Sequence, residues 1–400
     1  MMLKNLVFIS LLIVILGGCT AAPAAPAETL PVATLPLAEA EDLFPVKTEL
    51  RHAKAFTVEY HDTYKLVTVL QPWRDADITF SYILVQRGTM PPADTGNAQV
   101  IEIPIQTAAS LSTTHLPYWD ELGQLDTLVA VGNSIYINNP KVLDRLRNKT
   151  IEAVGNGPDV NVEVLLALQP EIITTTALGN SKKDDYQLLL DKGFHVVIIS
   201  DFMEETPLGR AEWVKFIALF TNQEAKAEEV FAGIEGRYQK IQKLAQDAKG
   251  CPTVLLGYEI NGTWHMPGGK SYQATYIREA GGCYLWADDK TTGRIPLSFE
   301  EVYAKAADAE YWFNQSSSWL TAADVLKADQ RYGKFNAFVQ GNTYNNNARV
   351  NPTGGNDYNE SGHANPDLVL ADLIAILHPE LLPDHSLIYY RRLAPGVSQP

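Results

Sequence analysis

The chain has 400 residues, of which 46% are hydrophobic and 20% charged, and its formal net charge is −15. This excess of carboxylates argues against nucleic acid as a partner and against a broad docking surface for anionic lipids, but it allows a local basic pocket. Roughly 350 residues follow Pro45, which is more than one hydrophobic core usually spans, so two lobes are expected.

The first residues predict the cellular location. Lys4 supplies a positive charge, and residues 6–16 (LVFISLLIVIL) form an uncharged apolar run that suits a secretory signal and is short for a permanent membrane span. The run ends in LGGC, which puts Cys19 where a bacterial lipoprotein is cut and its thiol lipidated. We expect a signal peptide over residues 1–19 and an extracytoplasmic protein anchored through Cys19. An uncleaved anchor would also leave the rest of the chain outside.

Residues 20–45 are dominated by Ala and Pro and predict a semi-rigid tether. An N-terminal lobe is expected over residues 46–206. It opens with a hairpin that turns at residues 61–63, and further strands are expected at residues 78–88 and 99–107. Strands then alternate with amphipathic helices, which predicts a parallel sheet covered by helices. The strands are expected at residues 127–133, 171–177 and 194–200, and the helices at 162–169 and 184–193.

Residues 207–250 lack a strand pattern and predict a helical connector. Two apolar stripes are separated by Thr221-Asn-Gln-Glu224, which has the form of a capping box and predicts that one helix stops and a second starts there. The second helix would run to Gly250 over about 25 residues, or roughly 37 Å. A helix of that length between two α/β segments predicts a connector that links two lobes.

A C-terminal lobe is expected over residues 251–400, where the α/β rhythm resumes. Strands are expected at residues 253–260, 284–289, 310–315, 337–344 and 386–393, and helices at 271–282, 298–309, 321–335 and 366–381. The predicted fold class is therefore α/β, with two lobes of mainly parallel sheet joined by one long spine helix. Cys251 and Cys283 could form a disulfide or remain free thiols, and the sequence leaves both open.

Over about residues 100 to 393 the sequence resembles class III solute-binding proteins of ABC importers, the group that handles ferric siderophores, haem and cobalamin. The resemblance rests on the order and spacing of five segments. They are SLSTTHLPYWDELGQLDTLVAVGN, VEVLLALQPEII, PLGRAEWVKF, MPGGKSYQATYIREAGG and GGNDYNESGHANPDLVLADLIAILHPELLPDH. It implies a ligand cleft between the lobes and small closure on the ligand.

The resemblance also implies partners. A loaded protein of this family docks on a membrane permease, and through it on an ATPase, by one Glu on each lobe. The matching positions are Glu163 and Glu300, with Glu301 as an alternative. Both also have a plain structural explanation, because acids favour the first turn of a helix. We expect a monomer that binds a small metal chelate and needs no cofactor of its own.

Ligands of open α/β sheets lie beyond the carboxyl ends of the strands, so the loops there supply the cleft candidates. Aromatic side chains offer flat apolar walls, and Arg or Lys hold anionic oxygens. Each candidate could instead be structural: His115 as a hydrogen-bonded core residue, Arg210 as a brace for the spine, Trp264 and Tyr272 as core. The candidates are Ser112, Thr113, Thr114, His115, Thr176, Arg210, Trp264, His265, Lys270, Tyr272, Tyr344 and Arg349.

The segment GGNDYNESGHANPDLV (354–369) places Asp357, Glu360, His363 and Asp367 at metal-ligand spacing. However, Asn365-Pro366-Asp367 is typical of a helix start, which explains Asp367. The glycines predict a shaped loop before that helix, and without a helix the spacing does not gather the other three side chains on one face. We interpret the segment as a loop at the border of the cleft rather than a metal site.

Three other functions are open alternatives. An enzyme is disfavoured because G-x-S-x-G, H-E-x-x-H, Walker and C-x-x-C motifs are absent from the sequence. A carrier of free zinc or manganese would need three or four convergent ligands, whereas the eight histidines are scattered. A surface adhesin or signalling sensor with the same fold would lack the permease contacts.

Overall fold

The computed structural model describes residues 42–316 and 318–393. The predicted signal peptide, Cys19 and most of the predicted tether lie outside the described residues. Among the helices of those two ranges, none is long and apolar enough to cross a membrane.

The chain begins its first lobe with a four-stranded sheet in sequence order. Strands β1 to β3 are antiparallel, and β4 runs parallel to β3. The predicted hairpin between the first two strands is confirmed. Phe56 of β1 packs against Trp213 and Phe216 of the connector, so this sheet covers the connector helices. The strands are β1 (Phe56–Tyr60), β2 (Tyr64–Val69), β3 (Phe80–Gln86) and β4 (Gln99–Ile103).

A parallel five-stranded sheet completes the first lobe, in the order β7-β6-β5-β8-β9. The amide of Gln99 connects the two sheets, because it donates to the carbonyl of Val196 and accepts from its N–H, both at 2.8 Å. The strands are β5 (Ala108–Ser110), β6 (Leu128–Val131), β7 (Glu152–Ala153), β8 (Ile172–Thr175) and β9 (Val196–Ile198). The helices are α1 (Leu116–Glu121), α2 (Pro140–Arg147), α3 (Val162–Leu168) and α4 (Tyr186–Asp191).

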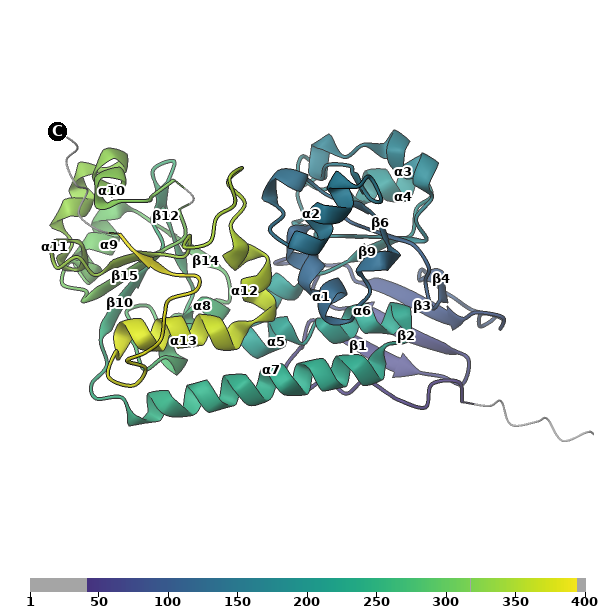
Figure 1. Cartoon of the computed structure of the whole chain (residues 1–400), viewed down its shortest axis with the longest axis horizontal. Helices are drawn as coiled ribbons and strands as arrows, with labels where there is room; N and C mark the ends of the chain where they lie inside the picture. The colour runs from purple at the N-terminus through teal and green to yellow at the C-terminus, as the bar shows by residue number, and fades with distance from the viewer. Residues whose placement is uncertain (1–41, 317, 394–400) are drawn as a thin grey trace, which may run out of the picture. The chain divides into compact units, whose positions relative to one another are not determined.

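Three helices connect the lobes: α5 (Pro207–Ala211), α6 (Val214–Thr221) and α7 (Glu224–Leu244). The side chains of α6 are buried along its whole length. The predicted long helix is present as α7, whose 21 residues give roughly 31 Å, shorter than expected. In Figure 1 it runs beneath both lobes, and it packs against α13 (Pro366–Leu377).

The predicted capping box between α6 and α7 is wrong. The hydroxyl of Thr221 donates back to carbonyls of its own helix, and Asn222, in the left-handed region at φ 53°, ends α6. Glu224 instead pairs with the fully buried Lys65 of β2. Glu224 is therefore used in a tertiary ion pair and not in the helix cap that the local sequence pattern predicts.

The second lobe contains a five-stranded sheet in the order β13-β10-β15-β16-β17, parallel except for β17. A disulfide between Cys251 and Cys283 joins the chain before β10 to β13, which resolves the open question about these thiols. The strands are β10 (Thr253–Leu256), β13 (Cys283–Tyr284), β15 (Tyr311–Asn314), β16 (Thr343–Asn345) and β17 (Arg391–Arg392). The mainly parallel α/β fold class is confirmed.

A small antiparallel sheet in the order β11-β12-β14 was not expected from the sequence. Its strands are β11 (Glu259–Ile260), β12 (Thr263–Pro267) and β14 (Arg294–Leu297). The strand expected at 284–289 is wrong beyond Tyr284, and the start of the strand expected at 337–344 is the helix α11. The remaining helices are α8 (Tyr272–Glu279), α9 (Phe299–Ala306), α10 (Ala322–Ala328), α11 (Asn336–Val339) and α12 (Ser361–Ala364).

Candidate functional site

A cavity of about 400 Å³ opens between the two lobes. The first lobe contributes Trp73 and Arg74, which follow β2, together with Leu178, Phe202 and Met203 from the loops after β8 and β9. The second lobe contributes residues that begin α8 and β14: Tyr272, Gln273, Thr292, Gly293 and Arg294. We call this cavity the cleft.

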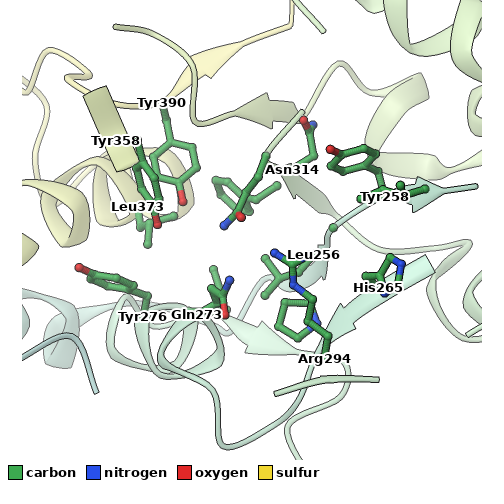
Figure 2. Close-up of a pocket in the computed structure, with 16 residues that line it drawn as sticks. Leu256, Tyr258, His265, Gln273, Tyr276, Arg294, Asn314, Tyr358, Leu373 and Tyr390 are labelled. Carbon is green, nitrogen blue, oxygen red and sulfur yellow. The ribbon is translucent and has the colours of Figure 1, made fainter. Parts of the chain in front are cut away.

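A second cavity of about 90 Å³ lies within the second lobe and shares Gln273 and Arg294 with the cleft. It is mainly aromatic and apolar. Figure 2 shows three buried tyrosines on one side of it, and Tyr258, His265 and Arg294 on the other. Burial holds the pKa of each of the three, Tyr276, Tyr358 and Tyr390, above the ordinary value, so they are neutral phenols. We call this cavity the side chamber.

Two arginines from opposite lobes meet at the cleft. Nη1 of Arg74 lies 3.4 Å from the carbonyl oxygen of Arg294, and a Cβ on Gly293 would lie 1.0 Å from Nη2 of Arg74. Glycine at 293 thus lets the guanidinium lie against the backbone of the other lobe. The described residues that line the cleft and the side chamber include no Asp or Glu. The site is therefore a basic, aromatic pocket in an acidic protein.

A buried ion pair supports the base of the cleft. Arg210 donates to Asp201 at 3.2 Å, and its guanidinium carbon lies 4.4 Å from the ring centre of Tyr272. Burial tends to raise the pKa of Asp201, but Arg210 and His363 outweigh burial and hold that pKa below its ordinary value. Both members of the pair are therefore charged. Arg210 lines neither cavity; it fixes the ring of Tyr272, which does line the cleft.

The loop after β5 holds four of the predicted cleft residues, and the structure places His115 in the core. Its Nε2 lies 3.2 Å from the hydroxyl of Thr176, and burial lowers its pKa to about 4, so the ring is neutral near pH 7. Ser112 and Thr114 bond to each other at 2.9 Å. Ser112, Thr113, Thr114 and Thr176 are half-buried and line neither cavity.

The predicted residues of the second lobe divide into two groups. His265 lines the side chamber and Tyr272 lines the cleft. Trp264 is a core residue, because its side chain is fully buried and its indole N–H donates to the carbonyl of Leu256 at 2.9 Å. Its place on β12 explains this burial, since alternate residues of a strand point to opposite faces.

Three further predicted residues line neither cavity. Lys270 is exposed in the turn before α8. Tyr344 stacks on Phe313 at a ring-centre distance of 5.6 Å, and Arg349 pairs with Asp357 at 3.0 Å. The turn accounts for the exposure of Lys270. Packing within the sheet accounts for the position of Tyr344, and the local ion pair accounts for that of Arg349.

The sequence did not single out Arg74, Arg294, Gln273 or Tyr276. Arg74 follows Trp73 directly after a predicted strand, and that position could have signalled it. Arg294 begins a strand that the local pattern did not reveal. The fold of the second lobe brings Gln273, Tyr276 and Arg294 together, and the way the first lobe faces it adds Arg74.

The four acid and imidazole side chains of the segment 354–369 each have a protein partner. Asp357 pairs with Arg349, His363 with Arg210, and Asp367 with Arg237 of α7 at 2.8 Å. Glu360 accepts backbone N–H groups of the first lobe. In the described ranges, no group of three or more His, Cys, Asp and Glu side chains could hold a metal ion. The segment also contains a helical turn, α12, where a loop was expected.

The two predicted docking acids are on the surface of different lobes. Glu163 is exposed in the first turn of α3, where Asn161 supplies the cap. Glu300 is 77% exposed in the first turn of α9 and lies 3.3 Å from Arg331. Glu301, the alternative, is used in a capping box with Ser298. Glu300 is therefore the more available acid of the second lobe.

Two relatives of this chain are lipoproteins of unestablished function in Methanocaldococcus jannaschii. One is 26% identical over 71% of this chain and 68% of the relative, and the other is 25% identical over 84% and 86%. Their description as lipoproteins agrees with the anchor predicted at Cys19.

Solved structures share the fold at low sequence identity. A possible iron-binding solute-binding protein of Staphylococcus epidermidis matches with a TM-score of 0.54 and 17% identity, over 69% of this chain and 99% of that chain. An Fe³⁺-hydroxamate transport protein of Saccharomonospora viridis matches with a TM-score of 0.53 and 14% identity, over 69% of this chain and 94% of that chain. A periplasmic haem-binding protein of Pseudomonas aeruginosa matches with a TM-score of 0.53 and 19% identity, over 72% of this chain and 98% of that chain.

The model of the periplasmic binding protein family matches residues 109–349. This span begins at β5 and includes both parallel sheets except β17, while the sheet β1–β4 precedes it. The expected family and the expected location outside the cytoplasm are both confirmed by this match. The chain belongs to the periplasmic binding protein family.

Proposed function

We propose that the chain captures an anionic metal chelate, or a related macrocycle with carboxylates, and delivers it to an ABC permease. The observation that carries the proposal is the cleft, which both lobes line with aromatic side chains and arginines and to which the described lining residues contribute no carboxylate. Guanidinium groups hold carboxylates and other anionic oxygens through paired hydrogen bonds. Fold neighbours described as iron-binding, Fe³⁺-hydroxamate and haem-binding proteins support this ligand class.

The size and lining of the cleft support a chelate over a bare ion. A volume of about 400 Å³ lies in the range of sites for small organic molecules. A bare zinc or manganese ion needs several donors converging within about 2 Å. The cleft instead offers Trp73, Phe202 and Tyr272 as flat surfaces and Arg74 and Arg294 as charges.

The ligand class is tested with protein purified from its own host. A Soret band in its absorption spectrum would indicate haem, and a broad visible charge-transfer band would indicate a ferric siderophore. Titrations with haemin, ferric catecholate, ferric acetohydroxamate, cobalamin and Zn²⁺ alone then compare the classes. Binding of Zn²⁺ alone would contradict the proposal, and so would chemical turnover of a bound chelate detected by mass spectrometry.

Substitution of Arg294 tests the role of the cleft. We expect Arg294→Gln to weaken binding of the best chelate by about 10- to 100-fold, because a charge-assisted contact is lost. Arg391→Gln is the matched control, since Arg391 is exposed on β17 and lines neither cavity. Isothermal titration calorimetry measures both. Equal affinities for the two variants would show that the ligand does not use this arginine.

A further inference from the structure

A short segment of the second lobe reaches the first lobe. We call Val350–Glu360 the clasp; it leads into α12, which Figure 1 shows between the two lobes, with α7 beneath them. The clasp is ordered by its own contacts. Val350 and Asn356 form an isolated bridge, and Oδ1 of Asn351 accepts from the N–H groups of Thr353 and Gly355 at 3.0 and 2.7 Å. These contacts lie within the clasp, so its shape does not depend on the other lobe.

The tip of the clasp donates to backbone carbonyls of the first lobe. Nδ2 of Asn351 lies 3.0 Å from the carbonyl oxygen of Ile135 and 2.9 Å from that of Ile137. The hydroxyl of Thr353 donates to the carbonyl of Ile135 at 2.5 Å. Both donors contact backbone, so the pairing depends on the path of the segment before α2 and not on its side chains.

Gly355 allows the close approach of the two lobes. A Cβ at this position would lie 2.5 Å from the carbonyl oxygen of Tyr136, a distance that real Cβ atoms do not adopt. Gly355 is buried, although Pro352, Thr353 and Gly354 directly before it are exposed. Any larger residue would push the clasp away from the first lobe.

Glu360 completes the contact from the base of the clasp. Its Oε2 accepts from the N–H of Asn138 at 2.6 Å and its Oε1 from the N–H of Asn139 at 2.8 Å. The side chain of Asn139 at the same time caps α2, accepting from the N–H groups of Lys141 and Val142. The carboxylate of Glu360 is thus bound to the start of a helix in the other lobe, 2% exposed.

We propose that the clasp is a built-in tether that holds the two lobes together, and so fixes the spacing of the cleft, without help from a ligand. The lobes are already joined through α7 and its neighbours, so a second attachment removes the freedom of hinge rotation about that connector. Ligand exchange would then require the clasp to open. This consequence for exchange rests on the proposed function, whereas the tether itself does not.

Hydrogen exchange of the ligand-free protein tests the tether. The N–H groups of Asn138 and Asn139 donate to Glu360, so their protection reports directly on the clasp. Mass spectrometry with fragmentation to single residues should show protected amides at Asn138 and Asn139 in the wild type, within a peptide of residues 134–141 whose other N–H groups, such as those of Tyr136 and Ile137, also have acceptors. In Glu360→Gln, whose amide offers one acceptor and one opposing donor, we expect both to exchange at least about tenfold faster. Small-angle scattering should show a larger radius of gyration.

Glu310→Gln is the matched control, because Glu310 also accepts a backbone N–H, that of Thr253, but within one lobe. It should leave the 134–141 peptide unchanged. Thr353→Val, at an exposed position, gives a milder opening if Glu360→Gln folds poorly. Unprotected amides at 138 and 139 in the wild type would overturn the proposal. Exchange of these amides at the wild-type rate in both Glu360→Gln and Thr353→Val would also overturn it.

Ligand kinetics separate this proposal from the proposed function. If haemin or a ferric catecholate binds, its dissociation should be faster in Glu360→Gln than in the control. If none of the probes binds, the proposed function fails while the exchange result still decides the tether. If Glu360→Gln binds the ligand and its amides at 138 and 139 exchange fast, but its ligand dissociation rate equals that of the control, the clasp does not govern ligand exchange.

Discussion

At the residue scale, His115 shows how burial changes the chemistry of a side chain. The loop after β5 was predicted to present it to a ligand, but the ring is fully buried and bonded to Thr176. Its pKa is lowered to about 4 because burial disfavours the charged form, even though Asp201 acts in the opposite direction. The neutral ring is a structural element whose protonation opposes folding.

This burial predicts a dependence of stability on pH. The unfolded chain binds a proton at His115 near pH 6.5, whereas the folded chain does so only near pH 4. The stabilising effect is therefore complete above pH 6.5 and is lost as the pH falls toward 4, by up to about 3 kcal/mol. Urea unfolding at pH 7 and pH 5 measures it. His115→Gln should flatten the profile in part, since His363 has the same kind of shift; an unchanged slope would contradict this assignment.

Arg74 and Arg294 show the reverse case, in which ordinary surface residues become a site. Each is exposed, and neither belongs to a recognisable motif. Both line the cleft, where Arg74 contacts the backbone carbonyl of Arg294. The chemistry of the site thus depends on two residues separated by most of the chain.

At the element scale, the clasp predicts a second effect of pH with the opposite sign. Burial raises the pKa of Glu360 from 4.5 to about 7, against the lowering effect of the two backbone N–H groups. Its charged neighbour is Asp357, which is paired with Arg349. On the first lobe, the side chain of Asn139 donates to Asp120, which is paired with Lys141. The buried, clasped form therefore binds a proton more tightly than a solvated Glu360 would. The protonated carboxyl still presents an oxygen to each of the two N–H groups, whereas the amide of Gln presents its NH₂ group to one of them.

Between pH 4.5 and 7, acidification should consequently favour the clasped form, and above pH 7 the cost of burying the charge is constant. We expect the protection factors of the amides of Asn138 and Asn139 to fall by about tenfold or more from pH 5 to pH 8. Hydrogen exchange corrected for the intrinsic rate at each pH measures this. A flat profile in the wild type, or the same profile in Glu360→Gln, would contradict it.

At the scale of the whole molecule, Glu163 and Glu300 stand on different lobes, so a partner that contacts both senses how the lobes are placed. We expect the double reversal Glu163→Lys/Glu300→Lys to reduce uptake through the permease by at least about tenfold while ligand affinity changes less than about twofold. The ion pair of Glu300 with Arg331 is exposed and contributes little to stability. Uptake into proteoliposomes that contain the permease, together with calorimetry, measures the two effects.

Asp191→Lys/Asp308→Lys is the control for this test, with one exposed acid reversed on each lobe. It should leave both uptake and affinity unchanged. Full uptake by the Glu163 and Glu300 reversal would exclude docking through these acids. Absence of uptake even with the wild-type protein would instead favour a sensor or an adhesin over a transport protein.

The sequence by itself determined the alternation of strands and helices, the long helix α7 and the family. The elements follow from local periodicity, because the burial of one face of a helix or strand leaves its pattern in neighbouring residues. The family follows from the order and spacing of sequence segments along the chain. Only the tertiary structure decided the disulfide, the sheet β11-β12-β14 and the burial of Trp264. It also decided the meeting of Arg74 with Arg294 and of Glu360 with Asn138. These contacts join residues far apart in the chain, where no local pattern records the partner and the packing of one lobe on the other sets the distance.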